Sequence, residues 1–151
     1  SKPRADTVSP SYHARIQVRM VDEPAIAFLA STLGGNYYEE SPSVANGRPL
    51  FCYQASDAKA ESVLRELRPF LRVKAQNADN VIAMRELQSK GRQHRTKVTG
   101  YRMLDNGRGD PSARMVPNLA FSDEYLAELH QHYEHAKWLN RVGIREDGRG
   151  E

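Results

Sequence analysis

Long hydrophobic runs and cysteines are both scarce in this chain. No apolar run approaches the ~20 residues that a membrane-spanning helix needs, and the first residues contain no apolar signal core. Cys52 is the only cysteine, so it cannot form a disulfide within the chain, and we expect a buried, inert thiol. These absences predict no membrane partner and favour an intracellular, cytoplasmic location with reducing conditions.

Several sequence signatures of enzymes are lacking as well. The chain contains no glycine-rich phosphate loop, no nucleophile elbow and no dinucleotide-binding fingerprint. The histidines near its end do not follow the HExxH spacing of a zinc site, and we interpret them as a solvated helix face; they are His130, His132 and His135. The sequence therefore predicts no stand-alone hydrolase and assigns no metal ligand.

The excess of charge is small. Lys and Arg number 22 against 19 Asp and Glu, and a net charge of +3 does not indicate nucleic-acid binding by itself. What is present is an ordinary globular composition, 39% hydrophobic and 27% charged over 151 residues, which fits one soluble domain. The positions of the charges therefore matter more than their sum.

Hydrophobic periodicity predicts an α+β fold. Residues 12–20 alternate with period two, as a half-buried strand does. Further strands are expected over 36–40 and 49–55, and helices over 24–33, 58–69, 74–90 and 120–142. Asp57 is expected to cap the second of these helices. Residues 91–119 are basic, show little periodicity and are punctuated by Gly, Asn and Pro, so we expect a long basic loop.

The strand over residues 12–20 has two different faces. Its apolar face holds Tyr12, Ala14, Ile16, Val18 and Met20, and its polar face holds His13, Arg15, Gln17 and Arg19. Arg pairs bidentately with guanine and Gln with adenine in the major groove, which admits a β-ribbon. The polar face is therefore either a base-reading surface or the solvated outer face of an antiparallel sheet. Tyr38 and Glu40, on the next strand, would extend the same surface.

Lys74 stands at the predicted start of a helix, next to apolar neighbours. A positive charge there opposes the helix dipole, which favours negative charge at this end. A nearby anion such as a DNA phosphate would account for the position. A side chain that extends to water from a short connection would account for it equally.

The segment Leu67–Leu87, which reads LRPFLRVKAQNADNVIAMREL, is the most informative stretch of the chain. It follows a strand, a helix, Gly34-Gly35, a strand, a long hairpin, a strand and the start of a helix. Over residues 11–90 this order resembles a single-motif LAGLIDADG homing endonuclease domain without its beginning. The final helix, with Trp138-Leu139-Asn140, is similar to the C-terminal helix of such proteins. The resemblance implies an antiparallel sheet that forms a saddle over the DNA major groove.

The resemblance also implies roles for individual residues. Those that would face or border the DNA are His13, Arg15, Gln17, Arg19, Tyr38, Glu40 and Arg48. Lys74 would be the catalytic residue near the scissile phosphate, where it balances charge or helps to order water. Cleavage in the family needs Mg²⁺ held by acidic residues at the ends of paired LAGLIDADG helices. The implied partners are double-stranded DNA and a second copy or complementary chain that carries this helix.

The acidic LAGLIDADG helix is not among these residues, so we expect the N-terminal αβ portion of the fold to be missing or truncated, with residues 1–10 a remnant. The helix belongs to a longer natural protein, is provided by another chain, or was lost together with cleavage. Met20 and Val21 stand where many members place a Gln near the metal, which favours impaired cleavage. The expected parts are a DNA-binding core over 1–90, the basic loop over 91–119, a C-terminal helix over 120–142 that packs on the core, and a disordered tail over 143–151.

The sequence thus predicts a sequence-specific double-stranded DNA-binding domain. Metal-dependent phosphodiester cleavage would follow only if the acidic helix is supplied. The alternative is a protein-interaction module that buries its polar sheet face against a partner polypeptide.

Overall fold

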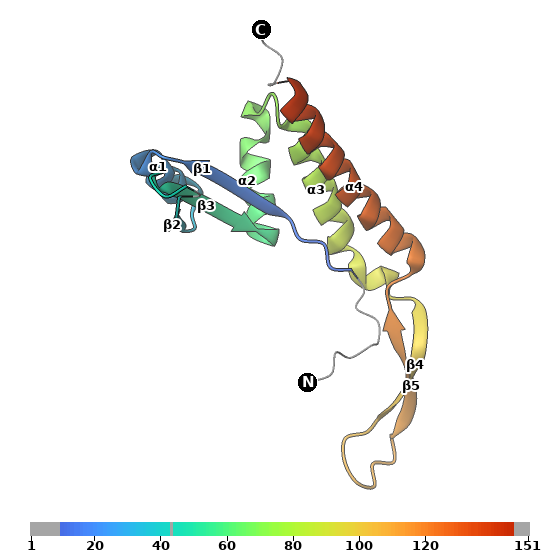
Figure 1. The fold of residues 1–151 in the computed structure, drawn as a ribbon. Coiled ribbons are helices and arrows are strands. Elements are labelled where there is room, and N and C mark those ends of the chain that lie inside the picture. The colour runs from blue at the N-terminus through green and yellow to red at the C-terminus, as the bar shows by residue number, and fades with distance from the viewer. Residues whose placement is uncertain (1–9, 43, 147–151) are drawn as a thin grey trace.

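The structure has a mixed α+β architecture, as the periodicity predicts (Figure 1). A computed structural model describes residues 10–42 and 44–146 of the chain. The elements in chain order are β1 (Arg15–Met20), α1 (Glu23–Leu33), β2 (Tyr37–Glu40), β3 (Leu50–Ser56), α2 (Asp57–Leu67), the short 3-10 helix η1 (Arg68–Phe70), α3 (Ala75–Ser89), the 3-10 helix η2 (Gly91–His94), β4 (Lys97–Leu104), β5 (Arg114–Ala120) and α4 (Asp123–Glu146). The strands and helices expected before residue 91 are all present, with bounds close to those expected.

The main sheet is antiparallel, with β3 between β1 and β2. Val18 of β1 and Tyr37 of β2 both lie opposite Tyr53 of β3. Directly opposed residues point to the same side of a sheet, so this row forms its inner side together with Ala55. Tyr53 is completely buried, and its hydroxyl donates to the carbonyl oxygen of Gly34 at 3.0 Å. The alternation read from the sequence therefore separates a buried side from an exposed one.

Helices α1 and α2 cover the inner side of the sheet. The carboxylate of Asp22 caps α1, Pro24 lies in its first turn, and Gly34 ends it with a φ of +75°. Ile26 of α1 and Ala60 of α2 are fully buried in one core cluster with side chains of the sheet. One side of the sheet is thereby closed to solvent, and its other side is left for polar groups.

Helices α3 and α4 pack side by side in opposite directions (Figure 1). A hydrogen bond of 3.0 Å joins Asn77, near the start of α3, to Asn140, near the end of α4. Tyr125 and Leu129 of α4 are buried in the core cluster together with side chains of the sheet and of α1. Across the described ranges, no helix combines the length and apolar character needed to cross a membrane.

The expectations for the two ends of the chain fall partly outside the residues that the structure describes. Residues 143–146, expected in a disordered tail, belong to α4. The rest of that tail, residues 147–151, lies outside the described residues. The same holds for residues 1–9, where we expect the remnant of a strand.

The expectation of a long loop over residues 91–119 is wrong. The segment forms η2 and an antiparallel hairpin of β4 and β5, which projects from the helical layer (Figure 1). A register shift between Val98 and Gly100 interrupts the alternation of β4, and Pro117 lies inside β5, so neither strand has the usual sequence pattern. One face of this hairpin is apolar and exposed; its residues are Val98, Tyr101, Met103, Met115, Pro117 and Leu119.

The prediction that Asp57 caps α2 is also wrong. Ser56 occupies the N-cap position, and Asp57 is the first helical residue, with a φ of +47°. A positive φ is unfavourable for a residue with a side chain, so other contacts must fix this conformation. The carboxylate of Asp57 contacts His13 and Arg85 instead of the helix N-terminus.

Candidate nucleic-acid interface

The side of the sheet that α1 and α2 leave uncovered carries polar side chains from β1, β2 and β3. The register places Arg19 and Tyr38 opposite Cys52, and Gln17 opposite Gln54, so these residues share this side. We call this surface the open sheet face; it consists of Arg15, Gln17, Arg19, Tyr38, Glu40 and Gln54. The structure thereby brings most of the predicted DNA-facing residues onto one surface.

Hydrogen bonds link the open sheet face from strand to strand. Gln17 Nε2 donates to Gln54 Oε1 at 3.0 Å, and Arg19 Nε lies 3.0 Å from Glu40 Oε2 in an ion pair. The Tyr38 hydroxyl lies 3.3 Å from Glu40 Oε1 and 3.4 Å from Gln54 Oε1, and it donates to one of them at a time. The hydrogen bond and the charge of Glu40 raise the pKa of Arg19, so its guanidinium stays charged. The face is a connected polar network.

Arg15 and Arg19 are both exposed, but the Arg15 side chain has no hydrogen-bond or ion-pair partner in the described part of the chain, whereas Arg19 is paired with Glu40. The two arginines together outnumber the single carboxylate of Glu40 by one charge. The open sheet face therefore attracts anions only weakly. What it offers a ligand instead is a set of hydrogen-bonding groups of defined geometry.

Cys52 lies on the same side of β3, between Arg19 and Tyr38, and is fully buried. Its burial was expected from the sequence and is confirmed. Interaction with the Cys52 sulfur, with burial and the charge of Glu40 adding to it, raises the pKa of Tyr38 to about 12. The Tyr38 hydroxyl is therefore a neutral donor at physiological pH.

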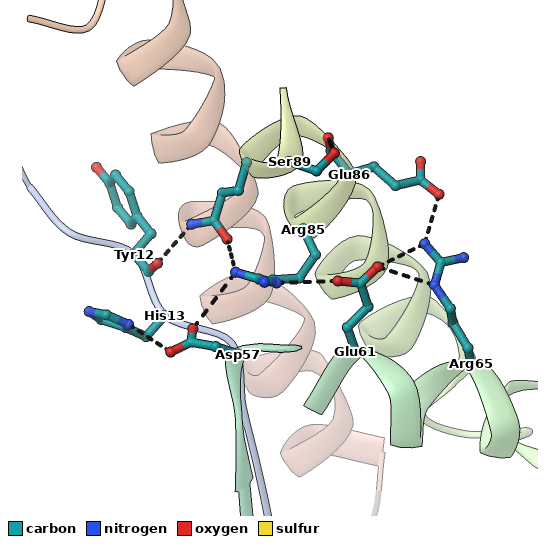
Figure 2. A network of polar contacts seen from close by, with 9 residues as sticks. Tyr12, His13, Asp57, Glu61, Arg65, Arg85, Glu86 and Ser89 are labelled. Atoms are coloured by element: carbon teal, nitrogen blue, oxygen red, sulfur yellow. Dashed lines mark hydrogen bonds and ion pairs between the residues drawn. The ribbon is translucent and has the colours of Figure 1, made fainter. Parts of the chain in front are cut away.

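His13 lies before β1 and is engaged away from the open sheet face. Its ring Nδ1 lies 3.2 Å from Asp57 Oδ2. Figure 2 shows that Asp57 begins a row of alternating charges that runs to α2 and α3. In this row Arg85 lies 4.0 Å from Asp57 and 3.4 Å from Glu61, and Arg65 lies 3.0 Å from Glu61. His13 thus joins the segment before β1 to the helices, and its other ring nitrogen, Nε2, lies 2.8 Å from Ser11 Oγ.

Arg48 and Lys74 lie on connections between elements. Arg48 is exposed in the connection between β2 and β3, shortly before β3 begins. Lys74 is exposed at the N-cap position of α3 and makes no side-chain cap hydrogen bond. Its neighbour Val73 is 78% exposed, so the connection is open to solvent. No hydrogen bond or ion pair within residues 10–42 and 44–146 joins Lys74 to the open sheet face.

Gln54 is the residue of the open sheet face that sequence reasoning missed. The strand β3 reads LFCYQAS, which resembles a continuous apolar run. Its inner residues Tyr53 and Ala55 are buried, whereas Gln54 is half-buried on the other side. The period of two in this strand is the signal that identifies Gln54.

A magnesium site is not assembled by the residues that the structure describes. Within them, no group of three or more His, Cys, Asp or Glu side chains lies close enough to hold a metal ion. The carboxylate of the open sheet face, Glu40, is paired with Arg19. Met20 and Val21 are exposed at the end of β1 and offer no oxygen ligand, which Mg²⁺ requires.

No protein-family model matches the chain, and neither a curated protein nor a solved structure matches it. The proposal for its function therefore rests on the arrangement of its own side chains.

Proposed function

We propose that this protein is a LAGLIDADG-like domain that binds double-stranded DNA and reads its sequence with the open sheet face. The observation that carries the proposal is an antiparallel sheet with helices on one side and Arg15, Gln17, Arg19 and Gln54 on the other. Arg and Gln form the bidentate pairs that distinguish guanine and adenine in the major groove. The face holds the side-chain types that direct readout uses.

The dimensions of the sheet support this proposal. Two strand spacings separate β1 from β2, on the order of 10 Å across the sheet. The major groove of B-DNA is about 12 Å wide, so a sheet of this width fits along it. Side chains that stand perpendicular to the sheet would then reach base edges from neighbouring strands.

The hydrogen bonds within the open sheet face are compatible with this role. The Arg19–Glu40 pair and the Gln17–Gln54 bond are exposed to solvent, and such contacts contribute little to stability. On binding, a base edge would take the place of Glu40 as the partner of Arg19, or of one glutamine as the partner of the other. Arg15 needs no such exchange, so we assign it the first contact with a base. Tyr38, Glu40 and Arg48 would border the contact.

Cleavage belongs to the proposal only where an acidic LAGLIDADG helix is supplied. Mg²⁺ would then be held by that helix and supply Lewis-acid chemistry at the scissile phosphate. Lys74 would balance the charge of the phosphate. The described residues on their own carry out recognition.

Selection of random duplex DNA by the 151-residue chain, followed by sequencing, tests the proposal. We expect enrichment of a motif of about ten base pairs, one turn of the duplex. A variant with Arg15→Ala, Gln17→Ala and Gln54→Ala should lose the motif and keep salt-sensitive binding to any duplex. Absence of an enriched motif, together with tight binding of an acidic protein, would favour the protein-interaction module instead.

Addition of Mg²⁺ to the selected duplex then separates recognition from cleavage. We expect the chain to leave the duplex intact. Strand breaks that disappear in Lys74→Ala would contradict this expectation and show that the chain completes a nuclease site itself.

A further inference from the structure

The open sheet face leaves an electrostatic requirement unmet. Its excess of one positive charge is small, whereas contacts with phosphates supply a large part of the affinity of most DNA-binding proteins. A domain that reads bases with this face needs cationic groups elsewhere. The base of the β4–β5 hairpin is where the structure gathers them.

A hollow of about 500 Å³ lies at this base. It is lined by Arg92, Arg95, Arg102, Pro117, Asn118 and Leu119. The arginines come from two segments, the η2 region and β4, so the fold brings them together across the start of the hairpin. No acidic residue lines the hollow, and the strands β4 and β5 contain no Asp or Glu.

The positive charges of the hollow are not neutralised by the described residues. Arg19, Arg65, Arg68 and Arg85 each form ion pairs with carboxylates, whereas none joins Arg92, Arg95 or Arg102 to a described carboxylate. Lys97, on the same hairpin, is paired with Asp123 at 2.9 Å. The Arg95 guanidinium lies 4.9 Å from the centre of the Phe121 ring, a contact that orients it without neutralising it. Three like charges held together are stabilised by an anion.

We propose that this arginine-lined hollow binds phosphate groups of the backbone of the DNA that the open sheet face reads. The inference rests on the proposed DNA-binding function. Guanidinium groups bind phosphate bidentately, and the Asn118 amide adds a neutral donor to the same hollow. Contacts of this kind position the duplex and carry no sequence information.

The experiment measures the association constant of the full chain for the selected duplex across a salt series. The variants are the single change Arg102→Gln and the triple change of Arg92, Arg95 and Arg102 to Gln. The slope of log K against log salt is negative, and removal of one phosphate-binding arginine should reduce its magnitude by about 0.9. The triple variant should therefore show a slope whose magnitude is smaller by about 2.7. The enriched motif should be unchanged. Arg141→Gln is the matched control, because Arg141 is exposed near the far end of α4.

A triple variant with Lys in place of Gln guards against misfolding. It preserves the charges, so it should retain most of the salt slope and unfold at the temperature of the parent. An unchanged slope in the Gln triple variant would overturn the proposal. A change of slope in Arg141→Gln as large as that in Arg102→Gln would overturn it as well. If the parent enriches no motif, the salt series uses a duplex of random sequence; a slope of smaller magnitude for the Gln triple variant there means that base reading by the sheet fails and the phosphate-binding hollow stands. If the parent enriches a motif and the triple change to Gln leaves the salt slope unchanged, base reading by the sheet stands and the phosphate-binding hollow fails.

Discussion

Arg15→Ala is the sharpest test of the open sheet face, because Arg15 is exposed in β1 and has no partner among the described side chains. Removal of its guanidinium leaves no buried group unpaired, so the free energy of unfolding should change by less than about 0.5 kcal/mol. Loss of a bidentate contact with guanine should instead cost about 1–3 kcal/mol of binding free energy, on the order of 5- to 150-fold in Kd.

Fluorescence anisotropy on two duplexes measures this effect. One is the selected duplex, and the other differs from it by a single substituted guanine. We expect the parent to discriminate between them and Arg15→Ala to bind both with the weaker affinity. Arg141→Ala removes an exposed arginine of α4 and should leave both affinities unchanged. An equal decrease in affinity for both duplexes, with discrimination intact, would refute base reading by Arg15.

Arg19→Ala provides an internal comparison. Arg19 must give up its 3.0 Å contact with Glu40 before it binds a base, so its removal should weaken binding less than removal of Arg15. In a Glu40→Gln background this difference should shrink, because Arg19 no longer has a carboxylate to leave.

Three further predictions concern the scaffold. Ile26→Ala should lower the free energy of unfolding by about 2–5 kcal/mol in denaturant titrations, because Ile26 is fully buried, whereas Phe28→Ala on the same helix, 71% exposed, should have a small effect. Cys52 should resist thiol reagents in the folded protein and react once the protein is unfolded; fast reaction without denaturant would contradict its burial. The hydrogen bond from Arg68 lowers the pKa of Asp79, so this pair stabilises the fold at pH values above the ordinary pKa of 3.8, and the stabilisation is lost as the pH falls through the lowered pKa. Urea unfolding at neutral and at acid pH measures this loss. The difference between the two free energies of unfolding should be smaller in Asp79→Asn than in the parent.

The sheet and its first helices were predictable because their residues differ sharply between faces. In β1 each charged or amide side chain is followed by an apolar one, and burial follows this alternation as far as Val18. Asp22, Pro24 and Gly34 mark the ends of α1 by local chemistry alone. Such signals need no knowledge of the rest of the chain.

The missed features depend on partners that are distant in sequence. The hairpin has an irregular register at Val98 and a proline in β5, and its apolar face has no described partner, so neither strand carries the usual alternation. Asp57 is drawn into contacts with His13 and Arg85, which lie 44 and 28 positions away, and local capping preferences do not reveal this. Gln54 was hidden in a strand whose sequence is mostly apolar, LFCYQAS, so the polar side of this strand does not stand out.

The projecting hairpin also has a consequence for cooperativity. Because β4 and β5 pack chiefly on each other, they can open while the core around Tyr53 remains folded. An isolated two-stranded hairpin is only marginally stable in water. Its backbone amides should therefore exchange with deuterium through local opening, and those of β3 only through global unfolding. Binding at the hollow would then have to order the hairpin first, so part of the interaction free energy is spent on conformational entropy and reappears as slower amide exchange in β4 and β5.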